Sequence, residues 1–349
     1  MERRSVQQNL RGQLLNSTSS SSLKARAFAV PMVAGAAMMF GIAYDPATAE
    51  AAACTSMTAS GTVVVSGACG PQTGTPTGNL SVYYENATVT SSTGNAVANG
   101  SSANNIQALF WNFGSPNSIV SSFDTGSGIV LTATGSGLVS VSTHDIDQTY
   151  IPGSGPFIYN EITSTITGNL SGIVTSAAAG ATTIDIGASD TITGNKSHAI
   201  SASSTSGSIS LTTAAGSLVR GSVVSGTGAG IFAASSASGN ISGNIAGNVT
   251  GDWAVNLGTS GTGTINMVYS GNVTGTDGAI KQATDQGNNT LSVTAGTVTT
   301  TGTVGGNASI LLSVGTGTGN ITTAAGTLVQ ATGGSAAIGI SAISGTSGA

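Results

Sequence analysis

A short motif that recurs along the chain is the feature that most constrains its fold. The stretch Leu211–Val219 (LTTAAGSLV) returns almost unchanged as Ile321–Val329 (ITTAAGTLV), and Leu291–Val298 (LSVTAGTV) is a weaker third copy. Self-similarity of this kind is typical of repeat architectures, in which each unit packs mainly on its neighbours. The motif therefore predicts a stack of similar units.

Two further motifs set the length of the unit. The first is a small residue followed by an aliphatic one: Ala199-Ile200, Gly230-Ile231, Ala254-Val255, Ala279-Ile280, Ser309-Ile310 and Ala337-Ile338. The second is Gly-Asn-aliphatic-Ser/Thr, which begins at Gly168, Gly239, Gly247, Gly271 and Gly319. The first motif repeats every 24 to 31 residues or so, which is in the range of solenoid coils.

Within the repeats, aliphatic residues alternate with Ser, Thr or Asn, as in Ser208–Thr212 and Thr264–Val268. An alternation of period two is typical of half-buried strands, and Gly interrupts the windows in which a helix could form. We therefore expect an all-β protein, a right-handed parallel β-helix with coils of about 24–31 residues. About seven coils fit between Ile158 and Ala349, which makes a rod of roughly 35 Å at about 4.8 Å per coil.

Composition agrees with a thin, repeated core. The 349 residues include 52 Gly and only 6% charged side chains, against about 25% in an average soluble domain. A mean hydropathy of +0.25 disfavours disorder, because disordered chains combine low hydrophobicity with high net charge. There is no Gly-X-Y period, which excludes collagen.

The first 50 residues have the parts of an extended secretory signal peptide. Five of the eight basic residues precede the uncharged run Ala27–Tyr44, and Ala47-Thr48-Ala49 follows as a cleavage site after Ala49. An uncleaved anchor and a lipoprotein site at Cys54 are the alternatives.

Residues 51–157 hold most of the aromatic side chains of the exported part, so we expect an N-terminal cap with irregular first coils there. A separate small β-domain is the alternative. We expect residues 158–349 to form the β-helix repeats, incomplete at the C-terminus.

Cys54 and Cys69 are the only cysteines, and in an oxidising compartment they are expected to form a disulfide that closes a small loop. Free thiols are the alternative.

After the signal segment only Lys196, Arg220 and Lys281 are basic, against ten carboxylates. We therefore expect no nucleic-acid partner, and we expect no metal and no cofactor.

Four patterns in the sequence resemble parts of known catalytic or binding sites. Asp124–Ser127 (DTGS) matches an aspartic-protease loop, but that chemistry needs a second copy, which the chain does not have. On a strand Asp145 and Asp147 would point the same way, which would suit an inverting glycosidase or a cation site. His144 and His198 could serve a Ser-His-Asp triad, although no G-x-S-x-G elbow is present. Gly226–Gly230 imitates a phosphate loop, a weak signal in a chain so rich in Gly.

The sequence resembles a known family in three features. These are the long basic signal region, the two-cysteine start (Ala53–Thr55 to Ala68–Gly70) and repeats such as Gly271–Gly275 and Gly339–Ala342. They look like the adhesin-like passenger domain of a bacterial type V secreted autotransporter, and the likeness of style and composition covers most of the chain. The resemblance implies export to the surface or exterior of a Gram-negative bacterium. It also implies a C-terminal outer-membrane barrel. The sequence ends inside a repeat, so we expect the chain to be either the N-terminal piece of a longer protein or a truncated product.

These observations predict a non-enzymatic surface protein that acts as an adhesin or a structural stalk. Its outward Ser, Thr and Asn ladders would offer hydrogen bonds to host or neighbouring-cell glycans or proteins. Two alternatives remain open, a β-helical polysaccharide-active enzyme that uses Asp124, Asp145 and Asp147, and a surface-layer or matrix protein.

Overall fold

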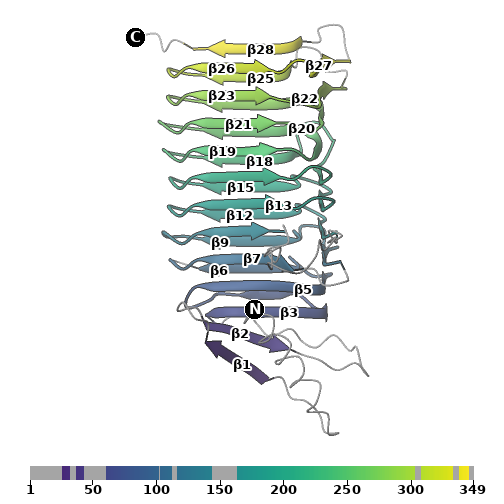
Figure 1. Cartoon of the computed structure of the whole chain (residues 1–349), viewed down its shortest axis with the longest axis vertical. Helices are drawn as coiled ribbons and strands as arrows, with labels where there is room; N and C mark the ends of the chain where they lie inside the picture. The colour runs from purple at the N-terminus through teal and green to yellow at the C-terminus, as the bar shows by residue number, and fades with distance from the viewer. Residues whose placement is uncertain are drawn as a thin grey trace, which may run out of the picture.

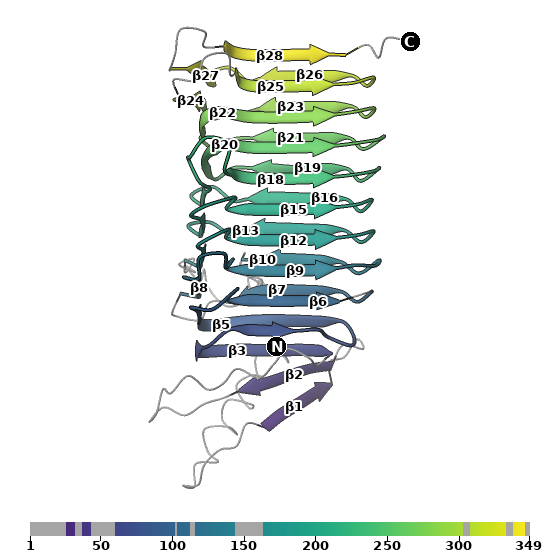
Figure 2. The same cartoon turned by 180° about the vertical axis from the view of Figure 1, so that it is seen from behind.

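The computed structural model describes residues 26–31, 37–42, 60–101, 103–111, 116–143, 163–302, 308–332 and 338–345. Its 26 parallel strands stack into one column, a β-solenoid of about 9 turns that runs from β3 to β28 (Figures 1 and 2). The described residues contain no helix, and so none that is long and apolar enough to cross a membrane. The all-β solenoid expected from the repeats is confirmed.

Each coil contributes one strand to each of three faces, which we call A, B and C. Face A consists of β4 (Gln72–Gly74), β6 (Val97–Ser101), β9 (Ile129–Ala133), β12 (Ile173–Ala177), β15 (Ile200–Ser204), β18 (Ala229–Ser235), the second halves of β20 (Asn248–Thr259) and β22 (Val273–Thr284), β25 (Ala308–Val314) and β28 (Ile338–Ser344). Face B consists of the first halves of β3 (Gly61–Cys69) and β5 (Leu80–Ser91), then β7 (Ile106–Trp111), β10 (Val139–Ser142), β13 (Thr182–Ile186), β16 (Ile209–Thr213), β19 (Ile241–Ile245), β21 (Ile265–Tyr269), β23 (Asn289–Val293) and β26 (Gly319–Thr323). Face C consists of the second halves of β3 and β5, then β8 (Ser118–Ser121), β11 (Thr165–Gly168), β14 (Thr191–Gly194), β17 (Leu218–Arg220), the first halves of β20 and β22, β24 (Thr297–Thr300) and β27 (Leu328–Ala331).

The strand register confirms the repeat and corrects its last unit. Ile200 pairs with Ile231, which pairs with Val255, and the series continues through Ile280 to Ile310, so five of the predicted aliphatic positions stack on one another. The sixth, Ile338, was wrong. Ile310 pairs with Ile340, and Ile338 pairs with Ala308, because Gly339-Ile340 and not Ala337-Ile338 continues the ladder.

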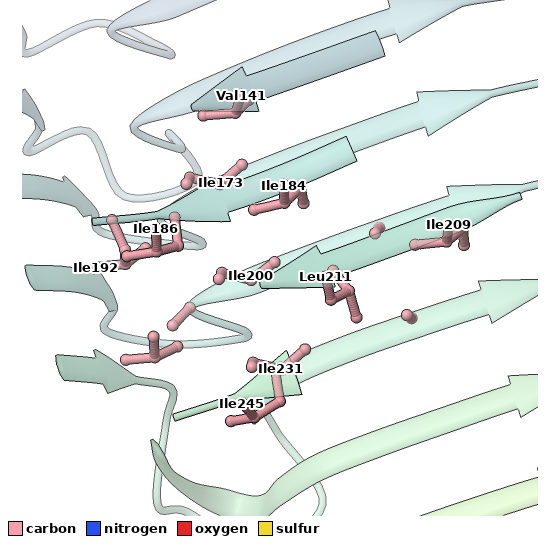
Figure 3. Packing of buried hydrophobic residues seen from close by; sticks show 14 of the residues in the cluster. Val141, Ile173, Ile184, Ile186, Ile192, Ile200, Ile209, Leu211, Ile231 and Ile245 are labelled. Carbon is pink, nitrogen blue, oxygen red and sulfur yellow. The ribbon is translucent and has the colours of Figure 1, made fainter. Parts of the chain in front are cut away.

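Inward side chains form unbroken aliphatic ladders. On face C the ladder is made of residues with no exposed surface: Ile166, Ile192, Val219, Val249, Val273 and Val298. Figure 3 shows Ile173, Ile200 and Ile231 above one another on face A, with Ile184 and Leu211 facing them from face B. Each coil thus buries its apolar residues against the coils on either side, and small residues suffice for this thin core.

The recurring LTTAAGSLV motif is the turn from face B to face C. Gly216 and Gly326 occupy the same place in two copies, with φ of 88° and 86°, a left-handed conformation that favours glycine. One residue later, Ser217 and Thr327 each donate a 2.8 Å hydroxyl hydrogen bond to a carbonyl three residues back. The motif recurs because the same turn recurs.

Asn side chains join successive coils at the turns. The Asn240 Oδ1 accepts the backbone N–H of Thr264 at 2.9 Å, and the Asn272 Oδ1 accepts that of Thr297 at 3.1 Å. The Asn272 amide also donates to Asn248 Oδ1 at 3.1 Å. Asn240, Asn248 and Asn272 are thus turn residues whose side chains link one coil to the next.

The aromatic-rich segment belongs to the same column, because the coils begin at Gly61 and β3 to β10 lie in the sheet of the later repeats. Tyr84 and Phe110 stack in its core with ring centroids 5.1 Å apart. Beyond β3, β1 (Arg26–Pro31) pairs antiparallel with β2 (Ala37–Ile42) (Figure 1).

The predicted cleavage residue Ala49 and Cys54 lie outside the described residues. Cys69, at the end of β3, is buried with 4% of its surface exposed. Its pairing with Cys54 stays a prediction.

Candidate functional site

Charged and ring-bearing side chains gather where face C turns into face A. We call this edge the C–A corner; its loops are residues 122–128, 169–172, 195–199, 221–228, 252 and 276–277. The loops stack as the strands do, for the N–H of Ser197 donates to Leu170 O and that of Ser222 donates to Ser197 O. The corner therefore brings together residues that are far apart in the sequence.

Asp124 and Lys196 form an ion pair at this corner, although 72 residues separate them. Both side chains are largely exposed, 77% for Asp124 and 49% for Lys196, so the pair adds little to stability. The DTGS match is a coil turn in which the N–H of Gly126 donates to Phe123 O at 2.9 Å. Asp124 thus faces a cation here and not the second carboxylate that aspartic-protease chemistry needs.

His198 is a turn residue of the corner and has close partners in the next coil. Its Nδ1 accepts the backbone N–H of Ala229 at 2.8 Å, and its ring stacks on Phe232 with centroids 4.8 Å apart. Burial lowers the pKa of the imidazole. The imidazole is therefore neutral, with its Nδ1 as a hydrogen-bond acceptor. Its contacts with Ala229 and Phe232 of the next coil stabilise the turn.

A carboxylate pair anchors the longest loop of the corner. Asp252 is buried, and its Oδ2 accepts the N–H of Gly226 at 2.5 Å. Asp277 lies in the next coil and accepts the Ser225 hydroxyl at 2.6 Å. Burial raises the pKa of Asp252, and the neighbouring Asp277 carboxyl raises it further. The two carboxyls hold loop 221–228 against the corner.

Loop 221–228 presents two exposed apolar side chains, Val223 and Val224, at 57% and 63% exposure. The run Gly226–Gly230 does not form a phosphate cradle, because its first N–H is already bonded to Asp252. Gly230 is small for packing reasons, since a Cβ there would lie 2.5 Å from the Val249 side chain. The geometry of Gly226–Gly230 therefore does not support a phosphate-binding loop.

His144, Asp145 and Asp147 lie outside the described residues, so the enzyme hypothesis that rests on them stays a prediction. Within the described part of the chain no three His, Cys, Asp or Glu side chains lie close enough to hold a metal ion. Within the described residues the corner offers one ion pair, anchored turns and two exposed apolar side chains, a surface suited to contact.

Sequence reasoning missed the approach of Lys196 to Asp124 and of Asp277 to Asp252. The second could have been found, because Asp252 and Asp277 are one coil apart by the spacing of Val255 and Ile280. The pairing of Lys196 with Asp124 could not have been found in this way. It depends on the length of the connection between β10 and β11, which the repeat does not predict. Comparison with protein-family models, curated proteins and solved structures finds no match to this chain.

Proposed function

We propose that this chain is an exported, non-enzymatic surface protein whose β-solenoid acts as an adhesin or a structural stalk, as in an autotransporter passenger. The observation that carries the proposal is the continuous solenoid of about 9 turns. Such a column holds its outward side chains at a fixed spacing of about 4.8 Å, which suits repeated contacts with an extended ligand or surface.

The outward surface of face A supports the proposal because it carries hydroxyl and amide groups beside apolar side chains such as Phe232 and Leu311 and is nearly uncharged. On face A the outward residues include Ser201, Asn256 and Thr132, and Lys281 is the single charged one among the described positions of β9 to β25. Hydroxyl and amide groups form hydrogen bonds without the long-range repulsion that a charged protein would meet at a charged cell surface.

Export is the second part of the proposal, and it rests on the basic, apolar and small-residue order of residues 1–50. An oxidising exterior would also allow the disulfide between Cys54 and Cys69. The resemblance to autotransporter passengers supports this part of the proposal, because such passengers are presented outside the outer membrane.

The experiment is expression of the full chain in a Gram-negative host, followed by mass spectrometry of the periplasmic and cytosolic fractions. We expect a periplasmic product that begins at Glu50 and has lost two hydrogen atoms, because the oxidising periplasm takes up two electrons and two protons when the Cys54–Cys69 bond forms. Beads coated with the purified product are then tested for attachment to bacterial and animal cells, and beads coated with a heat-unfolded sample are the control.

A cytosolic product with an intact N-terminus contradicts export. Absence of attachment above the unfolded control, together with a folded rod, contradicts the adhesin and leaves the stalk. Turnover of a polysaccharide by the same sample contradicts the non-enzymatic assignment.

A further inference from the structure

A groove of about 790 Å³ runs along face A, beside the turns that lead to face B. It crosses six consecutive coils, from Thr132 to Ala283, which corresponds to about 24 Å along the axis at about 4.8 Å per step. Its volume is within the range of ligand sites, about 300–1,000 Å³. The groove is long and shallow, a shape for an extended chain and not for a compact molecule.

The floor of the groove is one column of outward side chains, all of them small. The strand register stacks them in a row: Thr132, Ser176, Ser203, Ala234, Gly258 and Ala283. A Cβ at Gly258 would meet no atom within 4 Å, so the space directly above this floor position is open. The groove exists because no coil places a large residue in this column.

The two walls differ in chemistry. One wall is made by the half-buried side chains of Phe232 and Asn256, two positions earlier on their strands. The other wall is the row of A-to-B turns, whose lining residues include Thr205, Ser236 and Asp285. A ligand in the groove would contact the apolar ring of Phe232 and the Ala side chains. It would also lie within reach of the Ser and Thr hydroxyls and the Asn256 amide.

Asp285 is the only charged residue among those that line the groove, which disfavours a charged ligand. A peptide strand is also disfavoured. Peptides that bind in extended form usually add to an exposed sheet edge, and the strands under the groove, from β12 to β20, are hydrogen-bonded on both sides to neighbouring coils. The groove leaves no backbone edge to such a peptide.

We propose that this groove binds an uncharged polysaccharide, laid along the solenoid axis with its hydroxyls on the Ser, Thr and Asn side chains and its apolar ring faces on Phe232 and the Ala residues. The proposal rests on the adhesive function above and adds to it a ligand class and a site. Because several coils each contribute a polar or an apolar contact, affinity comes from the sum of weak hydrogen bonds and apolar contacts along the polysaccharide.

The test is affinity electrophoresis of the full chain in native gels that contain dextran, galactomannan or xyloglucan, with polygalacturonate as the charged comparison. Gly258→Leu and Ala283→Leu each place a large side chain on the floor. Gly94→Leu is the matched control, because a Cβ at Gly94 likewise meets nothing within 4 Å and Gly94 does not line the groove. Circular dichroism confirms that each variant is folded.

We expect at least one neutral polysaccharide to retard the wild type, and the two floor variants to bind it about tenfold or more weakly, while Gly94→Leu binds as the wild type does. Retardation by none of the neutral polysaccharides, retardation by polygalacturonate alone, or full binding by folded Gly258→Leu would overturn the proposal.

Bead attachment separates this failure from that of the proposed function. If wild-type and Gly258→Leu beads attach to cells equally well, the groove assignment fails and the adhesive function stands. If wild-type beads attach to nothing, the adhesive function itself fails.

Discussion

The phenol oxygen of Tyr269 accepts a 2.7 Å hydrogen bond from the side-chain amide of Gln282 inside the core. Both side chains are fully buried. Tyr269 ends β21 on face B, and Gln282 points inward from β22 on face A. Burial raises the pKa of the phenol, so the group stays neutral. The bond ties two faces of the solenoid across an otherwise aliphatic core.

Loss of either partner is expected to destabilise the solenoid. Tyr269→Phe leaves the Gln282 amide buried without its acceptor, and we expect a loss of about 1–3 kcal/mol in the free energy of unfolding. Gln282→Met leaves the buried Tyr269 phenol without its hydrogen-bond partner, and we expect a similar loss in the free energy of unfolding. The double variant should recover most of the loss, because both polar groups are then gone. Urea unfolding followed by circular dichroism measures all three, and strictly additive losses would contradict the pairing.

The Asn ladder at the turns is expected to contribute measurably to stability. Asn272→Ala removes the acceptor of the Thr297 N–H and the donor to Asn248, so we expect a loss of about 1–2 kcal/mol. Asn320→Ala is the control, because Asn320 has the same motif but makes no side-chain hydrogen bond within the described residues. Equal effects of the two substitutions in thermal unfolding would show that the ladder does not matter.

The carboxyl pair at the C–A corner predicts a pH dependence. A carboxyl whose pKa is raised by folding holds its proton more tightly in the folded state. Stability due to Asp252 should therefore fall as the pH rises from the ordinary carboxyl value through the raised pKa, and should stay constant above it. Asp252→Asn removes this dependence while it keeps an acceptor for the Gly226 N–H.

Melting temperatures of the wild type and of Asp252→Asn across the acidic range test this point. We expect the variant to lose part of the pH dependence and to be at least as stable as the wild type at neutral pH. A variant that is less stable at neutral pH and keeps the same pH profile would mean that the charged form of Asp252 is the favoured one.

The repeat made most of the fold predictable. Once Ile200, Ile231 and Val255 are recognised as equivalent, the coil length, the parallel pairing and the inward ladder all follow, since each coil must repeat the contacts of the last. The error at Ile338 arose because Gly339-Ile340 and Ala337-Ile338 both match the small-aliphatic pattern, and only strand pairing distinguishes them.

The surface was harder to predict than the core. The groove becomes visible in the sequence only after the register is known, when Ser203, Ala234 and Gly258 align in one small-residue column. The pairing of Lys196 with Asp124 depends on how loops of unequal length stack at the corner, and no periodic signal carries that information.

Removal of one whole coil tests the independence of the units. Deletion of Ile192–Leu218 joins Thr191 to Val219, which then replaces Ile192 on Ile166, because these residues occupy one ladder. We expect a shorter but folded β-rod with a slightly lower melting temperature. Deletion of Ile192–Ser204 breaks the register and should abolish cooperative unfolding. The opposite order of stability would contradict the one-dimensional account.

Distances between spin labels along the groove floor test the central claim most directly. In the full chain, labels at Thr132 and Gly258 are four coil steps apart, and labels at Thr132 and Ala283 are five steps apart. Backbone separations of about 19 and 24 Å follow from about 4.8 Å per step. Electron paramagnetic resonance should show narrow distributions whose centres differ by about one step. Broad distributions, or a separation that does not grow from Gly258 to Ala283, would contradict the stacked solenoid and the groove built on it.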